Sequence, residues 1–165
     1  MSNQDDVIDE LRRQVRELSD RWEILQLLAS YGPAVDSGSA EAAAALWTED
    51  GSYDTYPAPM AGRAAIAAMV NGERHQSYVH RGCGHLIGIP HIQLDGDTAV
   101  VTGYSQLVLR DREADGFRVW RTAANRWELV RTPQGWRVTR RINRLLDGSP
   151  ESHELLAAAV RPGEA

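Results

Sequence analysis

A carboxylate, an imidazole and a phenol stand at positions where they could together transfer a proton. Asp36 follows Tyr31 in the segment YGPAVD, and His85 lies at the start of the strand-like segment GHLIGIPHIQLDGDTA. A carboxylate that holds an imidazole leaves the second ring nitrogen free to take a proton, and a phenol beside them can donate one. Asp36 and His85 are far apart in the chain, so only the fold can bring them together.

The elements that must position these residues begin with helices. An apolar stripe over residues 7–18 has helical spacing, and Asp20 with Glu23 resembles a capping box that starts a second helix. The Gly-Pro pair at 32–33 is expected to end or kink that helix, because proline lacks the backbone donor and clashes with the preceding turn. Asp36 is therefore expected in or just past the kink.

Short elements follow. Ser39 is expected to cap an alanine-rich helix that ends near Trp47, residues 52–56 are typical of a short strand, and residues 62–70 of a further helix. The second half then reads as strands separated by turn signals such as Asp95-Gly96-Asp97. These strands are expected at residues 86–94, 98–109, 117–131 and 136–145, with a short helix at 150–160.

Helices followed by an antiparallel meander predict an α+β fold. We expect a cone-shaped barrel, in which a curved, mostly antiparallel sheet wraps around helices packed on its concave side and leaves one open mouth as a small-molecule pocket. A single domain over residues 1–148 is expected, with a C-terminal helix and tail over residues 149–165.

Composition narrows the functional classes. The chain has 165 residues, enough for one domain, and its net charge of −5 argues against a nucleic-acid or anionic-membrane partner. No apolar run approaches the roughly 20 residues that cross a bilayer. The acidic, polar first residues differ from a secretory signal, and the single cysteine, Cys83, cannot form an intrachain disulfide. We therefore expect a cytoplasmic location.

The motifs and their order resemble the SnoaL-like branch of the nuclear-transport-factor-2-like superfamily. The resemblance rests on Tyr-x4-Asp at 31–36, LWTEDGSYD at 46–54, H-x9-DGDTA from His85, and GWRVTRR at 135–141. It covers roughly residues 5–148. Within the superfamily the chain looks most like the scytalone dehydratase group, which includes bile acid dehydratases and a lindane dehydrochlorinase.

In that group a His–Asp dyad abstracts a proton and a tyrosine assists the leaving group. By motif position the dyad falls on Asp36 and His85, and the tyrosine on Tyr31. The resemblance implies a dehydratase-type lyase acting on a hydrophobic, oxygenated small molecule, with polycyclic compounds such as steroids or polyketides included. It also implies a homo-oligomer, a dimer or a trimer, because relatives expose the outer face of the sheet to partners. No cofactor is indicated, since no GxGxxG or P-loop pattern is present.

Polar and aromatic residues on the strands are candidates for substrate binding. Asn125 is the type of polar residue that sites of this group carry on later strands, and Arg141 could anchor an acidic group inside the cone. The complete set of substrate-binding candidates is Tyr53, Tyr104, Asn125, Trp127 and Arg141.

Structural roles remain open for the same residues. Asp36 could cap the helix that follows it, His85 could be a hydrogen-bonded strand histidine, and Tyr31 could belong to the core. Trp127, like the other four tryptophans, could likewise serve only as core. These alternatives differ from the catalytic hypothesis in where the side chains point.

The histidines could also serve two other chemistries. A metal site built from His80, His85, His91 and Cys83 matches neither HExxH nor paired CxxC spacing, so we expect no metal. A Cys83–His85 nucleophile pair is conceivable, but the glycines on both sides of Cys83 equally fit a bulge or a close backbone approach.

Four arginines near the end of the chain resemble a basic stripe. Strand alternation is expected to place Arg137 and Arg141 on one face and Arg140 and Arg144 on the other, so they make no single patch. Cross-strand ion pairs with acids such as Glu128 are the expected role for most of them.

Several classes of function therefore remain open. The first is the lyase just described, with an isomerase or cyclase on the same fold as its nearest rival. A ketosteroid-isomerase-like reaction would use an aspartate as base and a tyrosine as oxyanion donor, leaving His85 in the wall. The others are a ligand-binding module that breaks no bond and the structural small subunit of a ring-hydroxylating dioxygenase, which shares this fold.

Overall fold

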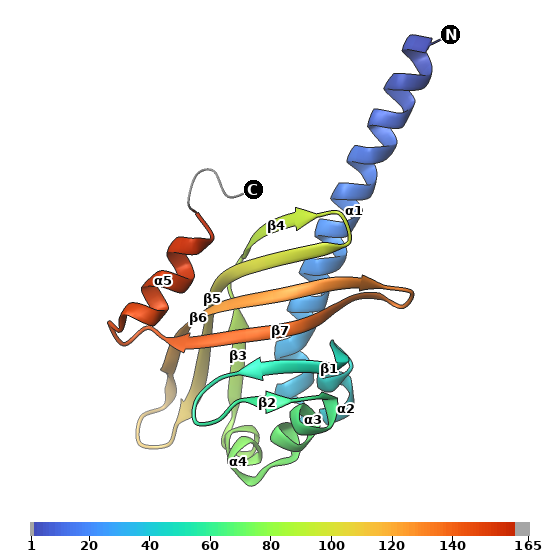
Figure 1. Cartoon of the computed structure of the whole chain (residues 1–165). Coiled ribbons are helices and arrows are strands. Elements are labelled where there is room, and N and C mark those ends of the chain that lie inside the picture. Colours follow the sequence, from blue (N-terminus) through green and yellow to red (C-terminus); the bar gives the residue numbers. More distant parts are fainter. Residues whose placement is uncertain (1, 161–165) are drawn as a thin grey trace.

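A computed structural model describes residues 2–160 as one curved sheet with helices at its concave side and its ends (Figure 1). In chain order the elements are α1 (Ser2–Asp36), α2 (Ala40–Ala44), β1 (Trp47–Asp54), β2 (Met60–Ala61), α3 (Arg63–Asn71), α4 (Glu73–Arg81), β3 (Cys83–Ile87), β4 (His91–Asp95), β5 (Thr98–Asp111), β6 (Gly116–Thr132), β7 (Gly135–Leu145) and α5 (Pro150–Ala158).

The sheet follows the order β2-β1-β7-β6-β5-β3, and β4 also pairs with β5. Every strand pair is antiparallel except β1 with β7, which run parallel. The predicted α+β class and the curved, mostly antiparallel sheet are confirmed. The sheet stays open, however, because β2 at one end does not pair with β3 or β4 at the other.

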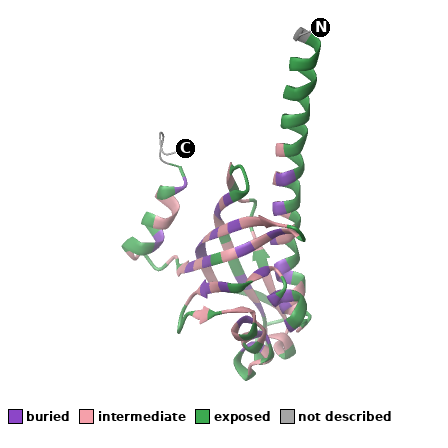
Figure 2. Cartoon of the chain, turned by 45° about the vertical axis from the view of Figure 1, so that its right-hand side comes forward, coloured by how far each residue is buried: buried purple, intermediate pink, exposed green. Residues whose placement is uncertain are grey.

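The core lies between the sheet and the second half of α1. Ile24, Leu28, Tyr31 and Val35 recur at helical spacing and are all buried, so one face of this helix half packs into the concave side. Large side chains of β6 and β7, such as Trp127, complete the core. The first half of α1 instead projects away from the sheet and is exposed on nearly all sides (Figure 2).

The predicted break between two N-terminal helices is wrong, because α1 is one continuous helix. Asp20 does not cap a helix; its carboxylate accepts hydrogen bonds from Arg131 at 2.6 Å and from the Trp136 indole at 3.3 Å. The Gly-Pro pair at 32–33, which was expected to end or kink a helix, does not end it. Pro33 lies inside α1, and its carbonyl accepts from the Ser37 amide, so the last turn still closes and Asp36 becomes the final helical residue.

Two further differences concern the middle of the chain. The strand expected at 86–94 is divided, because Gly88, Ile89 and Pro90 separate β3 from β4. Helix α4 was not predicted at all, since its segment ERHQSYVHR is polar and buries only His75. The alanine-rich helix ends at Ala44 rather than near Trp47, and Trp47 instead begins β1, five residues before the strand expected at 52–56. The remaining predicted strands and the helix over 62–70 are present with bounds shifted by one or two residues.

A register shift on β7 changes the expected faces of its arginines. Between β6 and β7 the pairing moves from Glu128–Arg140 to Leu129–Val138, so one residue of β7 is left over. Val138 and Arg141 therefore both point into the core, and the prediction that Arg137 and Arg141 share a face is wrong. Glu128 pairs with Arg126 of its own strand at 3.0 Å, and Arg144 pairs with Asp54 at 2.7 Å.

Helix α5 is present where the C-terminal helix was expected, and it packs against β6 and β7. The end of the predicted tail, residues 161–165, lies outside the described residues. Among the helices of residues 2–160, none combines the length and the apolar content needed to cross a membrane. The boundary expected at residue 148, between the main domain and the C-terminal helix and tail, stays a prediction.

Candidate active site

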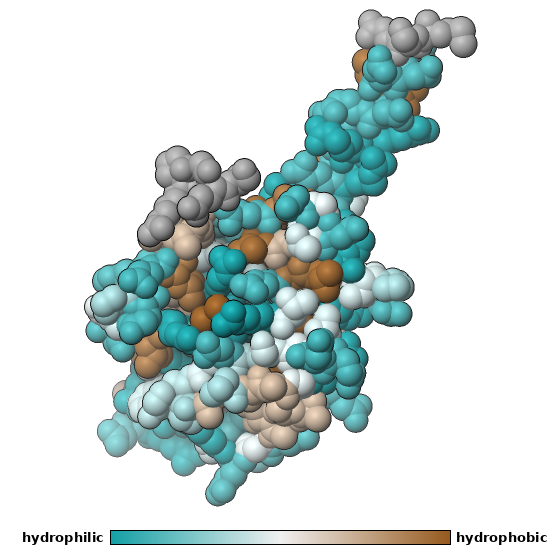
Figure 3. Space-filling view, viewed as in Figure 1, coloured by the Kyte–Doolittle hydropathy of each residue, from teal (hydrophilic) through white to brown (hydrophobic). Residues whose placement is uncertain are grey.

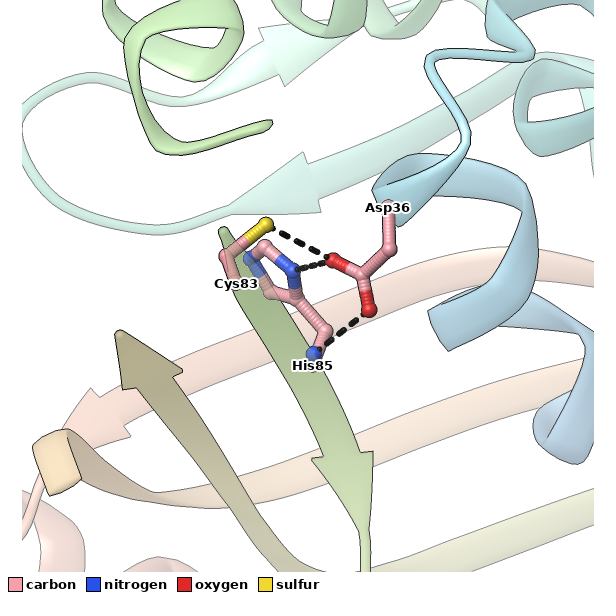
Figure 4. Close-up of side chains that lie close together, drawn as sticks. All are labelled: Asp36, Cys83 and His85. Atoms are coloured by element: carbon pink, nitrogen blue, oxygen red, sulfur yellow. Dashed lines mark hydrogen bonds and ion pairs between the residues drawn. The ribbon is translucent and has the colours of Figure 1, made fainter. Parts of the chain in front are cut away.

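Asp36 and His85 are in direct contact (Figure 4). One carboxylate oxygen of Asp36 lies 2.5 Å from His85 Nδ1, and the other accepts the His85 backbone N–H at 2.7 Å. The carboxylate thus holds both the ring and the backbone of the same residue. This two-point contact fixes the position of the imidazole relative to the end of α1.

A close backbone approach makes this contact possible. At Gly32 the helix passes so near to β3 that a Cβ would fall within 3.0 Å of the His85 carbonyl oxygen. Only a residue without a side chain fits there. Because Asp36 follows one turn later, the glycine sets the distance from which the carboxylate reaches His85.

The electrostatics of the pair favour one tautomer. Burial raises the pKa of Asp36, but hydrogen bonds from the His85 ring and backbone outweigh burial and bring the pKa below its ordinary value. An ionised Asp36 only accepts hydrogen bonds, so the proton of a neutral His85 ring belongs on Nδ1. Nε2 then carries a lone pair, and none of the described residues hydrogen-bonds to it.

Cys83 adds a third group to this cluster. Its thiol donates to the same Asp36 oxygen at 3.2 Å, and burial, together with that carboxylate, raises the pKa of the Cys83 thiol to about 12. The donor atoms of Asp36, Cys83 and His85 lie within 4.8 Å of one another, a spacing that a metal ion could use. A thiol must be deprotonated to bind a metal or to act as a nucleophile, and this environment opposes that. The predicted absence of a metal stays a prediction.

His85 opens onto a cavity of about 180 Å³. Its wall is mainly apolar and aromatic, with contributions from α1, β1, β2, the segment between β1 and β2, α3, α4 and β6. The lining residues are Tyr31, Tyr53, Thr55, Tyr56, Pro57, Ala58, Met60, Met69, Arg74, His75, Tyr78, His85 and Arg121. No carboxylate belongs to this described lining.

Strand register places a cation at the floor of this region. Tyr53 of β1 pairs with Arg141 of β7, which pairs with Trp127 of β6, so the three form one row across the concave face. The guanidinium carbon of Arg141 lies 4.4 Å from the ring centre of Tyr53, 4.0 Å from that of Trp127 and 4.4 Å from that of Tyr31. Rings surround the charge on several sides and stabilise it by cation–π attraction.

Arg141 is 2% exposed, and its hydrogen bonds go to a single side-chain amide. Its Nε and one terminal nitrogen donate to the Asn125 side-chain oxygen at 3.1 and 2.8 Å, and Asn143 donates to the same oxygen at 2.9 Å. The other terminal nitrogen is buried and has no partner among the described residues. Arg141 and Asn143 line a recess of about 10 Å³ that shares Tyr31, Tyr53 and His85 with the main cavity.

His75 is a cavity residue that sequence reasoning missed. It comes from α4, its ring stacks on His85 with centres 5.4 Å apart, and its Nε2 donates to the Val35 carbonyl at 2.8 Å. Burial lowers the pKa of His75, which favours the neutral ring. The segment did carry helix signals: Gly72 precedes it, Glu73 lies in its first turn, His80 and Arg81 lie in its last turn, and Gly82 follows it.

The predicted site residues thus fall into three groups. Tyr31, Tyr53 and His85 line the cavity, with Asp36 directly behind His85. Arg141 lies at the floor, and Asn125 and Trp127 are buried behind it. Tyr104 is 53% exposed and belongs to none of the cavity walls, so it does not lie where a substrate-binding residue was predicted.

Burial also gives Tyr31 an unusual environment. Burial raises the pKa of Tyr31 above its ordinary value, partly opposed by the neighbouring Arg141 charge. Its ring meets His85 edge-on with centres 6.4 Å apart. The phenol is therefore neutral and able to donate a hydrogen bond.

Comparison with known proteins supplies the family. Residues 16–142 match the SnoaL-like domain. The chain belongs to the SnoaL-like family. Its SnoaL-like relatives include an uncharacterised protein of Mycobacterium tuberculosis, 30% identical over 146 residues, which cover 82% of this chain and 92% of that protein.

Solved structures agree with this assignment. An NTF2-like protein with a cystatin-like fold from Novosphingobium aromaticivorans is 44% identical, with a TM-score of 0.85 over 88% of this chain and 94% of that one. A protein described as a candidate scytalone dehydratase, from the same organism, is 20% identical, with a TM-score of 0.66 over 78% of this chain and 85% of that one. The second likeness shows the SnoaL-like fold alone.

Proposed function

We propose that this SnoaL-like protein is a lyase or isomerase that removes a proton from carbon in a hydrophobic, oxygenated small molecule. The observation that carries the proposal is the two-point contact of Asp36 with His85 beside the cavity. It leaves Nε2 as the basic atom on the cavity side. The scytalone dehydratase group, which the sequence resembles, uses such a dyad.

The proposed step begins with a substrate whose C–H lies next to a carbonyl. His85 Nε2 takes the proton, and the electron pair of the C–H bond moves toward the carbonyl oxygen. Asp36 stabilises the imidazolium that forms. Tyr31 and Arg141 donate hydrogen bonds to the developing oxyanion, a role that fits the unpartnered Arg141 nitrogen.

The fate of the electron pair separates the two reactions. In an elimination the pair returns to form a double bond while the group on the next carbon leaves. In an isomerisation His85 gives the proton back at another carbon. Because the described lining holds no carboxylate, a departing group would depend on phenol and guanidinium donors. This favours substrates whose leaving group or enolate is already a good anion.

Carbon deprotonation can be tested before the natural substrate is known. 5-Nitrobenzisoxazole loses its ring C–H proton to a base while its N–O bond breaks, and it releases a coloured phenolate. The wild type is expected to accelerate this reaction, and His85→Gln to lower the rate by about 100-fold or more, because a positioned general base contributes about 10²–10⁴-fold. His91→Gln, at an exposed histidine of β4, is the matched control.

Binding must be followed in parallel. If His85→Gln binds a non-reactive analogue as tightly as the wild type and yet loses turnover, His85 acts in the chemical step. Equal rates for wild type and His85→Gln would refute the proposed base. A wild type that binds hydrophobic ketones but exchanges none of their C–H protons with D₂O would point instead to a protein that only binds its ligand.

A further inference from the structure

The projecting half of α1 carries a second apolar face that is largely exposed. Ile8, Leu11, Val15, Leu18 and Trp22 are 38–67% exposed. In Figure 3, apolar atoms appear among hydrophilic ones on this projecting part. Solvent-exposed surface of this kind marks an interaction site.

This face is distinct from the one that packs on the sheet. An α-helix turns by ~100° per residue, so Trp22 and the buried Ile24 point to nearly opposite sides. Leu25 is half-buried, so the second face begins at the body of the protein and continues toward the N-terminus. A partner on it would lie on the far side of α1 from the sheet, where this chain's own body leaves room.

The spacing of the second face is that of a coiled coil. Its residues follow one another in alternating steps of three and four. We call this set of residues the seam; it consists of Ile8, Leu11, Val15, Leu18, Trp22 and Leu25. In heptad terms Ile8, Val15 and Trp22 occupy position a, whereas the three leucines occupy position d. β-Branched residues at a with leucine at d favour two parallel strands over other assemblies.

The charges of α1 agree with pairing between two identical helices. The carboxylates of Asp9, Glu10 and Glu17 are held by arginines of the same helix and lie off the seam. In a parallel, in-register pair the residues facing each other beside the seam would be Val7 with Arg12, Gln14 with Ser19, and Arg21 with Gln26. No like charges oppose each other there.

We infer that the seam joins α1 to α1 of a second copy of this chain as a parallel, in-register coiled coil. The identical stripe on both copies satisfies the self-complementarity that a two-fold interface requires. The helix is already anchored to the sheet by Ile24 and Leu28, so association need not bear the cost of starting a helix. The two bodies would then lie on opposite sides of the pair.

A cysteine placed on the seam tests directly whether the two helices run parallel and in register. In a Cys83→Ser background, Leu11→Cys is expected to form a disulfide-linked dimer under mild oxidation, because equivalent d positions meet across a parallel pair. In an antiparallel pair Leu11 would face Trp22, and this disulfide would not form. Arg13→Cys, on the other side of the helix, is the matched control. Absent or equal cross-linking of the two variants would overturn the inference.

Sedimentation measures the strength of the pair. Leu11→Glu with Leu18→Glu changes the net charge by two units on the seam, and Arg16→Glu makes the same change off it. The seam variant is expected to raise the dimer dissociation constant by about 100-fold or more, because carboxylates would have to lose water against apolar groups. The control should stay near the wild type. Circular dichroism checks that α1 remains helical in both.

Other outcomes are informative as well. A wild type that is monomeric at tens of micromolar, or a seam variant with the mass of the wild type, would refute the inference. If the chain assembles through its sheet instead, the mass stays high in the seam variant while Leu11→Cys fails to cross-link. Capture of a different helical protein with a monomeric chain would likewise count against a second copy.

Discussion

Arg141 is the most deeply buried charge near the cavity, and its guanidinium meets rings and amides but no carboxylate among the described residues. Buried charges in proteins are usually paired, because desolvation costs several kcal/mol. An arginine kept with one nitrogen unpartnered is therefore costly for folding. That cost is understandable if the nitrogen serves a ligand.

Replacing Arg141 with methionine should separate folding from function. Arg141→Met keeps much of the side-chain length and removes the desolvated charge, so we expect a melting temperature equal to or above that of the wild type. Deprotonation of 5-nitrobenzisoxazole should fall by about tenfold or more, since one oxyanion donor is lost. Thermal unfolding and initial rates give both quantities.

The control for this substitution lies on the same strand. Arg140 is the exposed neighbour of Arg141, and Arg140→Met should alter neither the melting temperature nor the rate appreciably. A large fall in melting temperature for Arg141→Met would mean that the guanidinium holds the surrounding rings in place. Burial of Arg141 would then be no argument that it binds a ligand.

The pH dependence of stability should reveal the Asp36–His85 contact. Because hydrogen bonds lower the folded-state pKa of Asp36 below its unfolded value, its stabilisation is complete above about pH 4 and is lost as pH falls through the folded pKa. Asp36→Asn is expected to be about 1–2 kcal/mol less stable than the wild type at pH 7. That difference should shrink toward pH 3.

Denaturant titrations at pH 7, 5 and 3 measure this difference. Asp50→Asn, at an exposed carboxylate, serves as the control that corrects for the change in net charge. A stability gap that stays constant from pH 7 to pH 3 would show that ionised Asp36 contributes nothing through His85.

At the scale of elements, the crossing of α1 over β3 decides whether the dyad can form. Gly32→Ala should favour the helix by about 1 kcal/mol, since alanine is the better helix former. The new Cβ, however, would meet the His85 carbonyl, which is backbone and cannot rotate away. The clash is expected to outweigh the gain in helix propensity, so that Gly32→Ala loses about 1–3 kcal/mol of stability and has a lower deprotonation rate.

A second glycine provides the comparison. At Gly116 a Cβ would meet nothing within 4 Å, so Gly116→Ala should change stability by less than about 0.5 kcal/mol. Chemical denaturation and rate measurements on Gly32→Ala and Gly116→Ala test these two expectations. If Gly32→Ala were as stable and as active as Gly116→Ala, the close approach would not be what positions His85.

The strands were largely predictable from the sequence because their turns are local. The Asp95-Gly96-Asp97 turn located the end of β4 and the start of β5 within a few residues. The false helix start at Asp20 had the opposite origin. A capping pattern is local, whereas Asp20 is used by Arg131 and Trp136, more than a hundred residues away. Nothing near Asp20 in the sequence reveals that contact.

The site was predictable to a similar extent. The contact between Asp36 and His85 followed from family motifs, and the cavity position of Tyr53 from its strand. The prediction that Arg137 and Arg141 share a face was wrong because a register shift interrupts the alternation of β7. His75 was missed because α4 is strongly polar and buries only that one residue, so no run of apolar side chains marks the segment as part of the packed structure.

At the scale of the whole molecule, one helix serves two purposes. Its second half supplies the core face, Tyr31 and Asp36, whereas its first half carries the seam outside the body. Substitutions on the seam should therefore leave the dyad geometry unchanged. We expect the variant Leu11→Glu with Leu18→Glu to retain the wild-type deprotonation rate per chain. If the rate instead fell in proportion to the fraction of dissociated dimer, the two halves of α1 would not be independent.

The charge of the chain as a whole is opposite to the charge at the floor of its cavity. A carboxylate ligand approaching a protein of net charge −5 is repelled at long range, and it is attracted only once it nears the cavity, where Arg74 and Arg121 lie in the wall and Arg141 at the floor. Mobile ions screen the outer field far more than the buried one. Added salt should accordingly accelerate capture of an acidic ligand and leave its escape rate nearly unchanged, which stopped-flow mixing can follow through Trp127 emission. The protein would therefore bind anions selectively but slow their approach, whereas electrostatic steering speeds the approach of a ligand.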